Sequence, residues 1–153
     1  MGITIIYVPL IYMRDRGTYP PTSPCLWYFN WQKEIWMTFI ELGFAGLGGD
    51  YKVIWKAGPR TSNLVDPIKY RKARYIKYST KKLSKELKKV DLAIIDYPST
   101  PLREALEMEI PTLCLVPIWD DKYIRKEYKH LVKVTMNPNV VIHEWIKEMI
   151  HGR

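Results

Sequence analysis

Four short apolar runs constrain the fold of this 153-residue chain more than any other feature of its sequence. They cover residues 3–8, 53–55, 92–95 and 112–116, and a weaker, mixed run covers residues 74–78. The four runs are continuous and do not alternate with polar residues, which is typical of strands covered on both faces. We therefore expect a mostly parallel sheet with helices on both of its sides.

The segments between these runs favour helices. We expect helices over residues 31–42, 83–90, 101–108, 120–130 and 142–149. Ser79 or Thr80 is expected to cap the second of them, and Ser99 or Thr100 the third, with Pro101 at its first position. Strands that alternate with helices predict a doubly wound α/β sheet. Since the length is that of one ordinary domain, residues 1–153 are interpreted as a single Rossmann-like, three-layer α/β/α domain with a mostly parallel sheet.

The charge of the chain predicts an anionic partner. The formal net charge is +8, from 24 basic and 16 acidic side chains, and the segment from Lys69 to Lys89 holds ten Lys or Arg against a single acid, Glu86. The helix from Lys81 to Lys89 is open to three interpretations: a solvated face, an anchor on an anionic membrane surface, or a nucleic-acid patch. The nucleic-acid interpretation is disfavoured because base-reading and stacking residues do not accompany the lysines.

Cysteine content and hydropathy bear on the compartment. Cys114 lies in an apolar run, where a buried thiol is the usual explanation, and with Cys25 as the only other cysteine a disulfide framework is excluded. Apolar stretches of membrane-spanning length are absent from the sequence. We expect a cytoplasmic protein in a reducing compartment. Any contact that it makes with a membrane is expected to be peripheral. The lone glutamine, Gln32, together with abundant Lys, Ile and Tyr, hints at a thermophilic source.

The helix start after the third apolar run is the most informative candidate site. Asp96 ends that run, and Ser99 and Thr100 open the next helix. The first turn of a helix offers unpaired N–H groups and the positive end of the dipole, and the two hydroxyls add donors, so the segment is suited to phosphate. Glu104, one turn further on, is placed to accept hydrogen bonds from a ribose diol. Plain capping by Ser99, with Glu104 as an early helical acid, explains the same residues.

A second candidate site follows the second apolar run, and a third lies in the loop after the first. Gly58 allows close backbone approach, and Lys56 and Arg60 are able to neutralise or bind phosphate. A solvated strand end followed by a Gly-Pro turn explains this segment equally well. The long loop over residues 13–30 leaves the carboxyl end of the first strand, where open α/β sheets bind their ligands.

Two segments resemble the C-terminal, donor-binding half of GT-B-type glycosyltransferases. The first is Tyr51 to Arg60. The second runs from Asp96 to Leu113, with hydroxylated residues at a helix start, Glu-Ala one turn later and then a Pro-led strand. The resemblance covers about residues 3–117 and is closest to the surface-carbohydrate and cell-envelope polymer transferases. It implies a domain that binds a nucleotide-activated sugar or polyol phosphate, for surface polysaccharide or envelope polymer synthesis.

Residue roles follow from this resemblance. Ser99 and Thr100 would hold the diphosphate and Glu104 the ribose, while Lys56 and Arg60 would contact the phosphates or the leaving group. The donor is a substrate, so the resemblance implies no separate cofactor.

Further roles and two departures come from the same comparison. Arg14 and Arg16 would close over the donor, and Gly58 would lie against it, although relatives often carry a histidine at that position. Glu109 stands where a glycine commonly precedes the Ile-Pro pair.

The chain is half the length of a full GT-B enzyme, which has two such domains and usually keeps its catalytic base in the other one. We therefore expect a nucleotide-sugar-binding half that needs an acceptor domain or subunit for transfer, with catalytic residues unknown. The alternative is a non-catalytic α/β signalling or scaffold module that binds a protein partner. A metal site is not expected: the three histidines lack partners at ligand spacing, and helix capping is favoured for Asp120 and Asp121.

Overall fold

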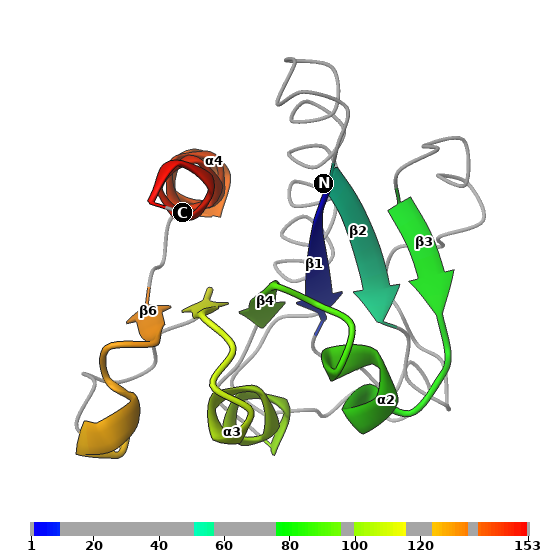
Figure 1. Cartoon of the computed structure of the whole chain (residues 1–153), viewed down its shortest axis with the longest axis horizontal. Helices are drawn as coiled ribbons and strands as arrows, with labels where there is room; N and C mark the ends of the chain where they lie inside the picture. The colour runs from blue at the N-terminus through cyan, green and yellow to red at the C-terminus, as the bar shows by residue number, and fades with distance from the viewer. Residues whose placement is uncertain are drawn as a thin grey trace, which may run out of the picture.

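The described part of the chain is built on one parallel sheet. A computed structural model describes residues 2–9, 51–56, 76–95, 100–115, 124–134 and 138–152. Its strands are β1 (Ile3–Val8), β2 (Tyr51–Lys56), β3 (Ile76–Ser79), β4 (Leu92–Ile95), β5 (Thr112–Cys114) and β6 (Val132–Val134). They lie in the order β3-β2-β1-β4-β5-β6, and every neighbouring pair is parallel (Figure 1).

This order places a reversal at the centre of the sheet. From β1 the chain adds β2 and then β3 on one side, and after β3 it crosses back to add β4, β5 and β6 on the other side of β1. A doubly wound sheet with the order 3-2-1-4-5-6 is the Rossmann arrangement, and the reversal between its first and fourth strands is its topological switch point. The predicted doubly wound α/β fold is confirmed.

Helices cover both faces of the sheet. They are α2 (Leu83–Leu87), α3 (Thr100–Glu107) and α4 (Pro138–His151). Figure 1 shows α2 and α3 on one face and α4 on the other. Along β1, Ile5 and Tyr7 belong to the cluster that contains the buried residues of α4, whereas Ile6 and Val8 belong to the cluster formed with α2 and α3. The three-layer α/β/α architecture follows from this alternation.

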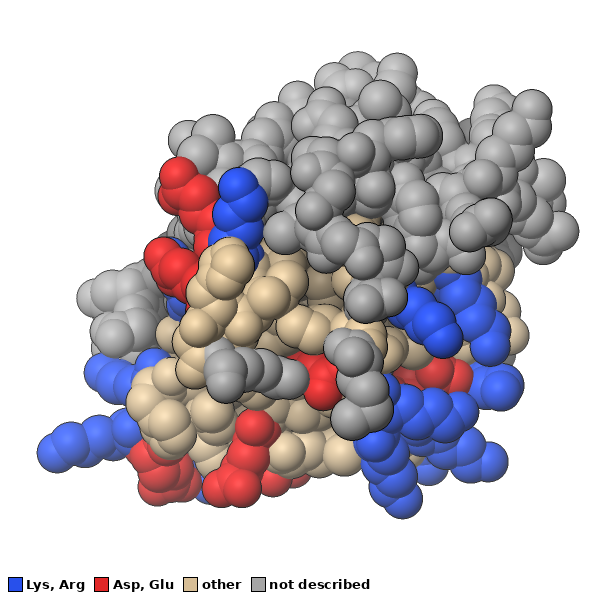
Figure 2. Space-filling view, turned by 45° about the horizontal axis from the view of Figure 1, so that its top comes forward, with Lys and Arg blue, Asp and Glu red and all other residues tan. Residues whose placement is uncertain are grey.

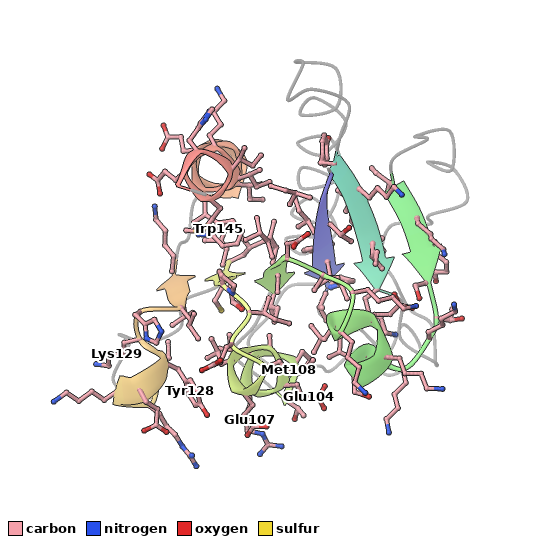
Figure 3. All side chains as sticks on the ribbon, in the orientation of Figure 1. Glu104, Glu107, Met108, Tyr128, Lys129 and Trp145 are labelled. Atoms are coloured by element: carbon pink, nitrogen blue, oxygen red, sulfur yellow. The ribbon has the colours of Figure 1, made fainter. Side chains whose placement is uncertain are left out.

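Burial explains why the apolar runs form the middle of the sheet. All four residues of β4 are buried, and so are Ile5 to Val8 of β1. Each large side chain removed from water in this way contributes about 1.5–3 kcal/mol. The rings of Tyr7 and Trp55, register partners on β1 and β2, meet edge to face with centroids 4.5 Å apart. Trp145 points from α4 toward the same layer (Figure 3).

Six of the eight expected elements that are present in the described residues match within about two residues, the usual uncertainty of element boundaries, whereas α2 ends three residues earlier than expected and α4 begins four residues earlier. The strands expected at 3–8, 53–55, 74–78, 92–95 and 112–116 are present, as are the helices expected at 83–90, 101–108 and 142–149. Pro101 is the second residue of α3, within its first turn, where its missing N–H has no intrahelical partner to lose. The helix expected at 31–42 lies outside the described residues.

Two local expectations were wrong. Neither Ser79 nor Thr80 caps α2: the residue before that helix is Lys82, and Ser79 still belongs to β3. The helix expected over residues 120–130 is not present in its described part, where only a 3-10 turn forms, at Lys126–Tyr128. The chain then enters β6, which was not expected because three residues are too few to give a periodic pattern.

Cys114 is a buried residue of β5, as expected for a thiol in an apolar run. Among the described helices, none has both the length and the apolar character needed to cross a membrane.

Candidate functional site

The carboxyl ends of β1 and β4 define the edge where the fold is suited to bind a ligand. Val8, the last residue of β1, is the register partner of Ile95, the last residue of β4. The connections that leave these two strands run in opposite directions across the sheet, which opens a crevice outside the strand ends in folds of this type.

Helix α3 begins at this edge. Four residues separate the end of β4 from Thr100, the first helical residue, which is exposed. The helix has eight residues and starts just after the end of β4. Its first-turn N–H groups and the positive end of its dipole therefore lie on the side of the strand ends. Glu104 lies one turn further on, is half-buried, and is on the flank of α3 turned toward α2 (Figure 3). The structure therefore brings Thr100 and Glu104 onto the helix that starts at the switch point.

The other end of α3 is closed by a left-handed residue. Glu109 has φ of 58°, its N–H donates to the Leu106 carbonyl (2.9 Å), and the Ile110 N–H donates to the Ala105 carbonyl (3.0 Å). These two bonds form a Schellman cap, and Ile110 packs in the same cluster as Ala105 and Leu106. Glycine adopts this backbone conformation at the lowest cost, and this chain places a glutamate in it.

A buried polar cluster lies at the ends of β2 and β3. Lys56 and Ser79 are register partners at the last position of their strands, and Glu86 approaches from α2. Their exposed fractions are 8%, 5% and 4%. The Ser79 hydroxyl donates to Glu86 Oε1 (3.2 Å), and Ser79 Oγ accepts a hydrogen bond from the Lys81 backbone N–H (3.2 Å). Ser79 thus links the strand end, the turn and the helix.

Burial affects the pKa of Lys56 in this cluster. Removal from water lowers the pKa of Lys56 below its usual 10.5, and the nearby negative charge of Glu86 opposes that change. Lys56 was predicted to meet phosphate directly. In the structure Lys56 is buried and lies under the electrostatic influence of Glu86. A phosphate contact by Lys56 stays a prediction.

Glu86 was not singled out from the sequence as a buried residue. It lies in a run of lysines, where an acid normally pairs with its exposed neighbours. The available signal was its place beside Leu87 and three residues after Leu83, which puts it near the apolar stripe that packs on the sheet.

Five of the predicted site residues lie outside the described residues, so their positions relative to the edge remain predictions. They are Arg14, Arg16, Gly58, Arg60 and Ser99. Asp120 and Asp121 lie outside them as well. Among the His, Cys, Asp and Glu side chains that are described, no three come together in a group suited to a metal ion.

Comparison with known proteins shows which solved structures share this fold. No family model matches the sequence, and no curated protein is significantly similar to it. Solved structures do match: S. aureus MnaA in its co-structure with UDP aligns over 97% of this chain with a TM-score of 0.66 and 14% identity. The glycotransferase of kitacinnamycin aligns over 97% with a TM-score of 0.56 and 13% identity.

These matches cover only part of the larger proteins. This chain spans 36% of the MnaA chain and 35% of the kitacinnamycin enzyme chain, about a third of each. The chain therefore has the fold of one Rossmann-like half of a GT-B-type enzyme, and the resemblance seen in the sequence is confirmed at the level of the fold.

Proposed function

We propose that this chain binds the nucleotide part of a nucleoside diphosphate sugar, or of a related polyol donor, at the carboxyl ends of β1 and β4. The observation that carries the proposal is the exposed start of α3 at the topological switch point of the sheet. Binding of UDP by MnaA, which shares the fold, supports the choice of a nucleotide ligand.

The residues of α3 have distinct proposed roles. The hydroxyls of Ser99 and Thr100, with the first-turn N–H groups, hold the diphosphate, because that end of a helix favours negative charge. Glu104 accepts hydrogen bonds from the ribose hydroxyls, which its half-buried place one turn into the helix permits. Arg60, Arg14 and Arg16 add positive charge from neighbouring connections.

The proposed role in transfer is that of a donor-binding half. Glycosyl transfer needs an acceptor nucleophile in line with the sugar carbon, and a chain that spans a third of the matched enzymes supports a division of the site between two domains or subunits. We place the reaction in surface polysaccharide or envelope polymer synthesis, on the resemblance of residues 96–113. The buried Cys114 thiol is consistent with a reducing, cytoplasmic setting.

Isothermal titration with UDP, GDP, CDP and their sugars tests this function. One of these nucleotides is expected to bind, and Glu104→Ala is expected to weaken binding about tenfold through loss of the ribose hydrogen bonds. Glu107→Ala is the matched control, since Glu107 is an exposed acid of the same helix that pairs with Arg103. Absence of binding by every nucleotide at millimolar concentration would sink the proposal and favour a scaffold module instead.

A further inference from the structure

Six lysines gather on β3 and around α2. They are Lys77, Lys81, Lys82, Lys85, Lys88 and Lys89, here called the lysine surface, and all six are exposed. Those around α2 recur at the helical spacing opposite to Leu83 and Leu87, which pack on the sheet. Figure 2 shows blue side chains gathered on the side of the molecule where α2 and β3 lie.

The fold removes the one acid of this segment from the surface. Glu86 is only 4% exposed, and it accepts a hydrogen bond from the Ser79 hydroxyl beneath the lysines. The sequence shows a run of lysines with one glutamate among them, whereas the fold leaves these lysines exposed and turns that glutamate inward. The carboxylate of Glu86 is therefore engaged by Ser79 and is not exposed among the lysine head groups.

Three cations elsewhere on the described surface lie close to acids. Arg103 lies 3.9 Å from Glu107, Arg125 lies 3.9 Å from Glu127, and Lys133 lies 3.9 Å from Glu148. Within the ranges that the structure describes, no member of the lysine surface has an ion-pair partner of this kind. A solvated face with ordinary charge balance, such as that of α3 and α4, does not leave six cations together.

The chemistry of the surface narrows the kind of partner. Tyr78, the aromatic residue next to Lys77, packs on the opposite, α4-facing cluster and is not offered for base stacking. The one large hydrophobic side chain exposed in the described residues is Met108, which belongs to the end of α3 and not to the lysine surface. The lysine surface is therefore suited to bind a partner through charge over a broad area, without aromatic stacking and without insertion of an apolar side chain.

We propose that the lysine surface docks the protein on an anionic lipid bilayer through electrostatic attraction alone. Clusters of four to eight basic residues on a helix are characteristic of binding to acidic headgroups, and each lysine near such a surface adds a similar increment. The surface rests on Glu86 and the lysines and not on the nucleotide site, so the inference is independent of the proposed function.

The mode of contact predicts its response to salt. Exposed charges are screened beyond a Debye length of about 8 Å at physiological ionic strength. Because the apolar side chains of α2 are used in the core, no hydrophobic term is left to hold the protein on the bilayer when salt is raised. Binding is expected to be reversible and to vanish at high ionic strength.

Co-sedimentation with vesicles tests the proposal. The full chain is mixed with phosphatidylcholine vesicles that contain or lack phosphatidylglycerol, at low and at high salt. Only the anionic vesicles at low salt are expected to carry the protein down. The triple variant Lys81→Gln/Lys85→Gln/Lys88→Gln is expected to bind roughly a hundredfold more weakly, from three lost increments of equal size.

A second triple variant keeps the test specific. Lys52→Gln/Lys126→Gln/Lys147→Gln removes the same total charge from exposed lysines of β2, the 3-10 turn and α4, and is expected to keep most of the binding. Circular dichroism checks that both variants are folded. Equal losses in the two variants, binding to neutral vesicles, or preferential binding of single-stranded nucleic acid that is lost in the first variant would each overturn the proposal.

Discussion

The chain uses the same dipeptide, Ser-Thr, in two strand-to-helix connections and obtains two different results. Ser79-Thr80 begins with the last residue of β3 and precedes α2, and Ser99-Thr100 follows β4 and ends with the first residue of α3. Both pairs have the composition of a helix cap, and both were expected to act as one. In the first connection the helix starts four residues after Ser79, so its hydroxyl is buried and bonded to Glu86. In the second the helix starts at Thr100 itself, which is exposed.

The difference shows that the number of residues between the hydroxyl and the first helical residue decides whether the hydroxyl bonds within the protein or stays exposed. A hydroxyl on the last residue of a strand is buried at the end of the sheet. It needs a hydrogen-bond partner within the protein, because burying it without one costs about 1–3 kcal/mol. A hydroxyl at the helix start stays at the edge, beside N–H groups that have no intrahelical acceptor. We therefore expect the second connection, and not the Ser79 hydroxyl, to meet an outside anion.

The largest expected effect comes from breaking the internal connection. Glu86→Ala removes the acceptor of the Ser79 hydroxyl and a negative charge close to Lys56, and is expected to lower the free energy of unfolding by about 3 kcal/mol. Urea denaturation measures the loss. Glu107→Ala, an exposed acid on α3, should cost less than about 0.5 kcal/mol. Similar losses in the two variants would contradict the structural role of Glu86.

The two Ser-Thr pairs should respond oppositely in nucleotide binding. Ser99→Ala/Thr100→Ala is expected to lower nucleotide affinity about tenfold, since hydrogen bonds to a charged diphosphate are lost. Ser79→Ala is expected to lower the free energy of unfolding by about 1 kcal/mol and to leave affinity unchanged. Titration calorimetry and urea denaturation of both variants measure the two quantities. A loss of affinity in Ser79→Ala alone would reverse the assignment of the connections.

The end of α3 offers a stabilising substitution. Glu109 holds φ of 58°, a conformation that disfavours every side chain with a Cβ. Glu109→Gly is expected to raise the free energy of unfolding by about 0.5–1 kcal/mol, the relief of strain being partly offset by the greater freedom of glycine in the unfolded chain. Thermal denaturation measures the gain. A lower melting temperature for the variant would show that the Glu109 side chain makes a compensating contribution.

The smallest effect concerns pH. Because the pKa of Lys56 is lower in the folded protein than its usual 10.5, the unfolded chain binds more protons at this site between the two values. Stability at this site therefore rises with pH through that alkaline window, and it is lowest below the folded pKa. Lys56→Met is expected to remove this rise. Urea denaturation of both proteins at several alkaline pH values tests it, and a constant difference between them would contradict the lowered pKa.

Much of the fold was predictable because the evidence for it is local. The continuous apolar runs at 3–8 and 92–95 become the two buried central strands, since a strand covered on both faces has no polar side to show. The stripe of Leu83, Leu87 and Val90 likewise sets which side of the segment packs on the sheet. The parallel Rossmann-like arrangement then follows from the alternation of strands and helices.

Other features were not predictable from local patterns. Strand β6 has three residues and exists because Thr112, Leu113 and Cys114 of β5 give it a parallel neighbour. Within residues 124–130 only Lys126–Tyr128 form a 3-10 turn. Only Ile124 and Tyr128 of that segment pack on the core, which is too little for the apolar stripe of a longer helix.

For the site, the sequence by itself determined which chemistry is present: hydroxyls and an acid at one helix start, and a lysine run with a single glutamate. Only the tertiary structure decided how that chemistry is divided. It placed the start of α3 at the switch point, and it turned Ser79 and Glu86 inward beneath the lysines. The physical reason is that burial and neighbouring strands are long-range properties, so identical dipeptides meet different surroundings once the sheet has formed.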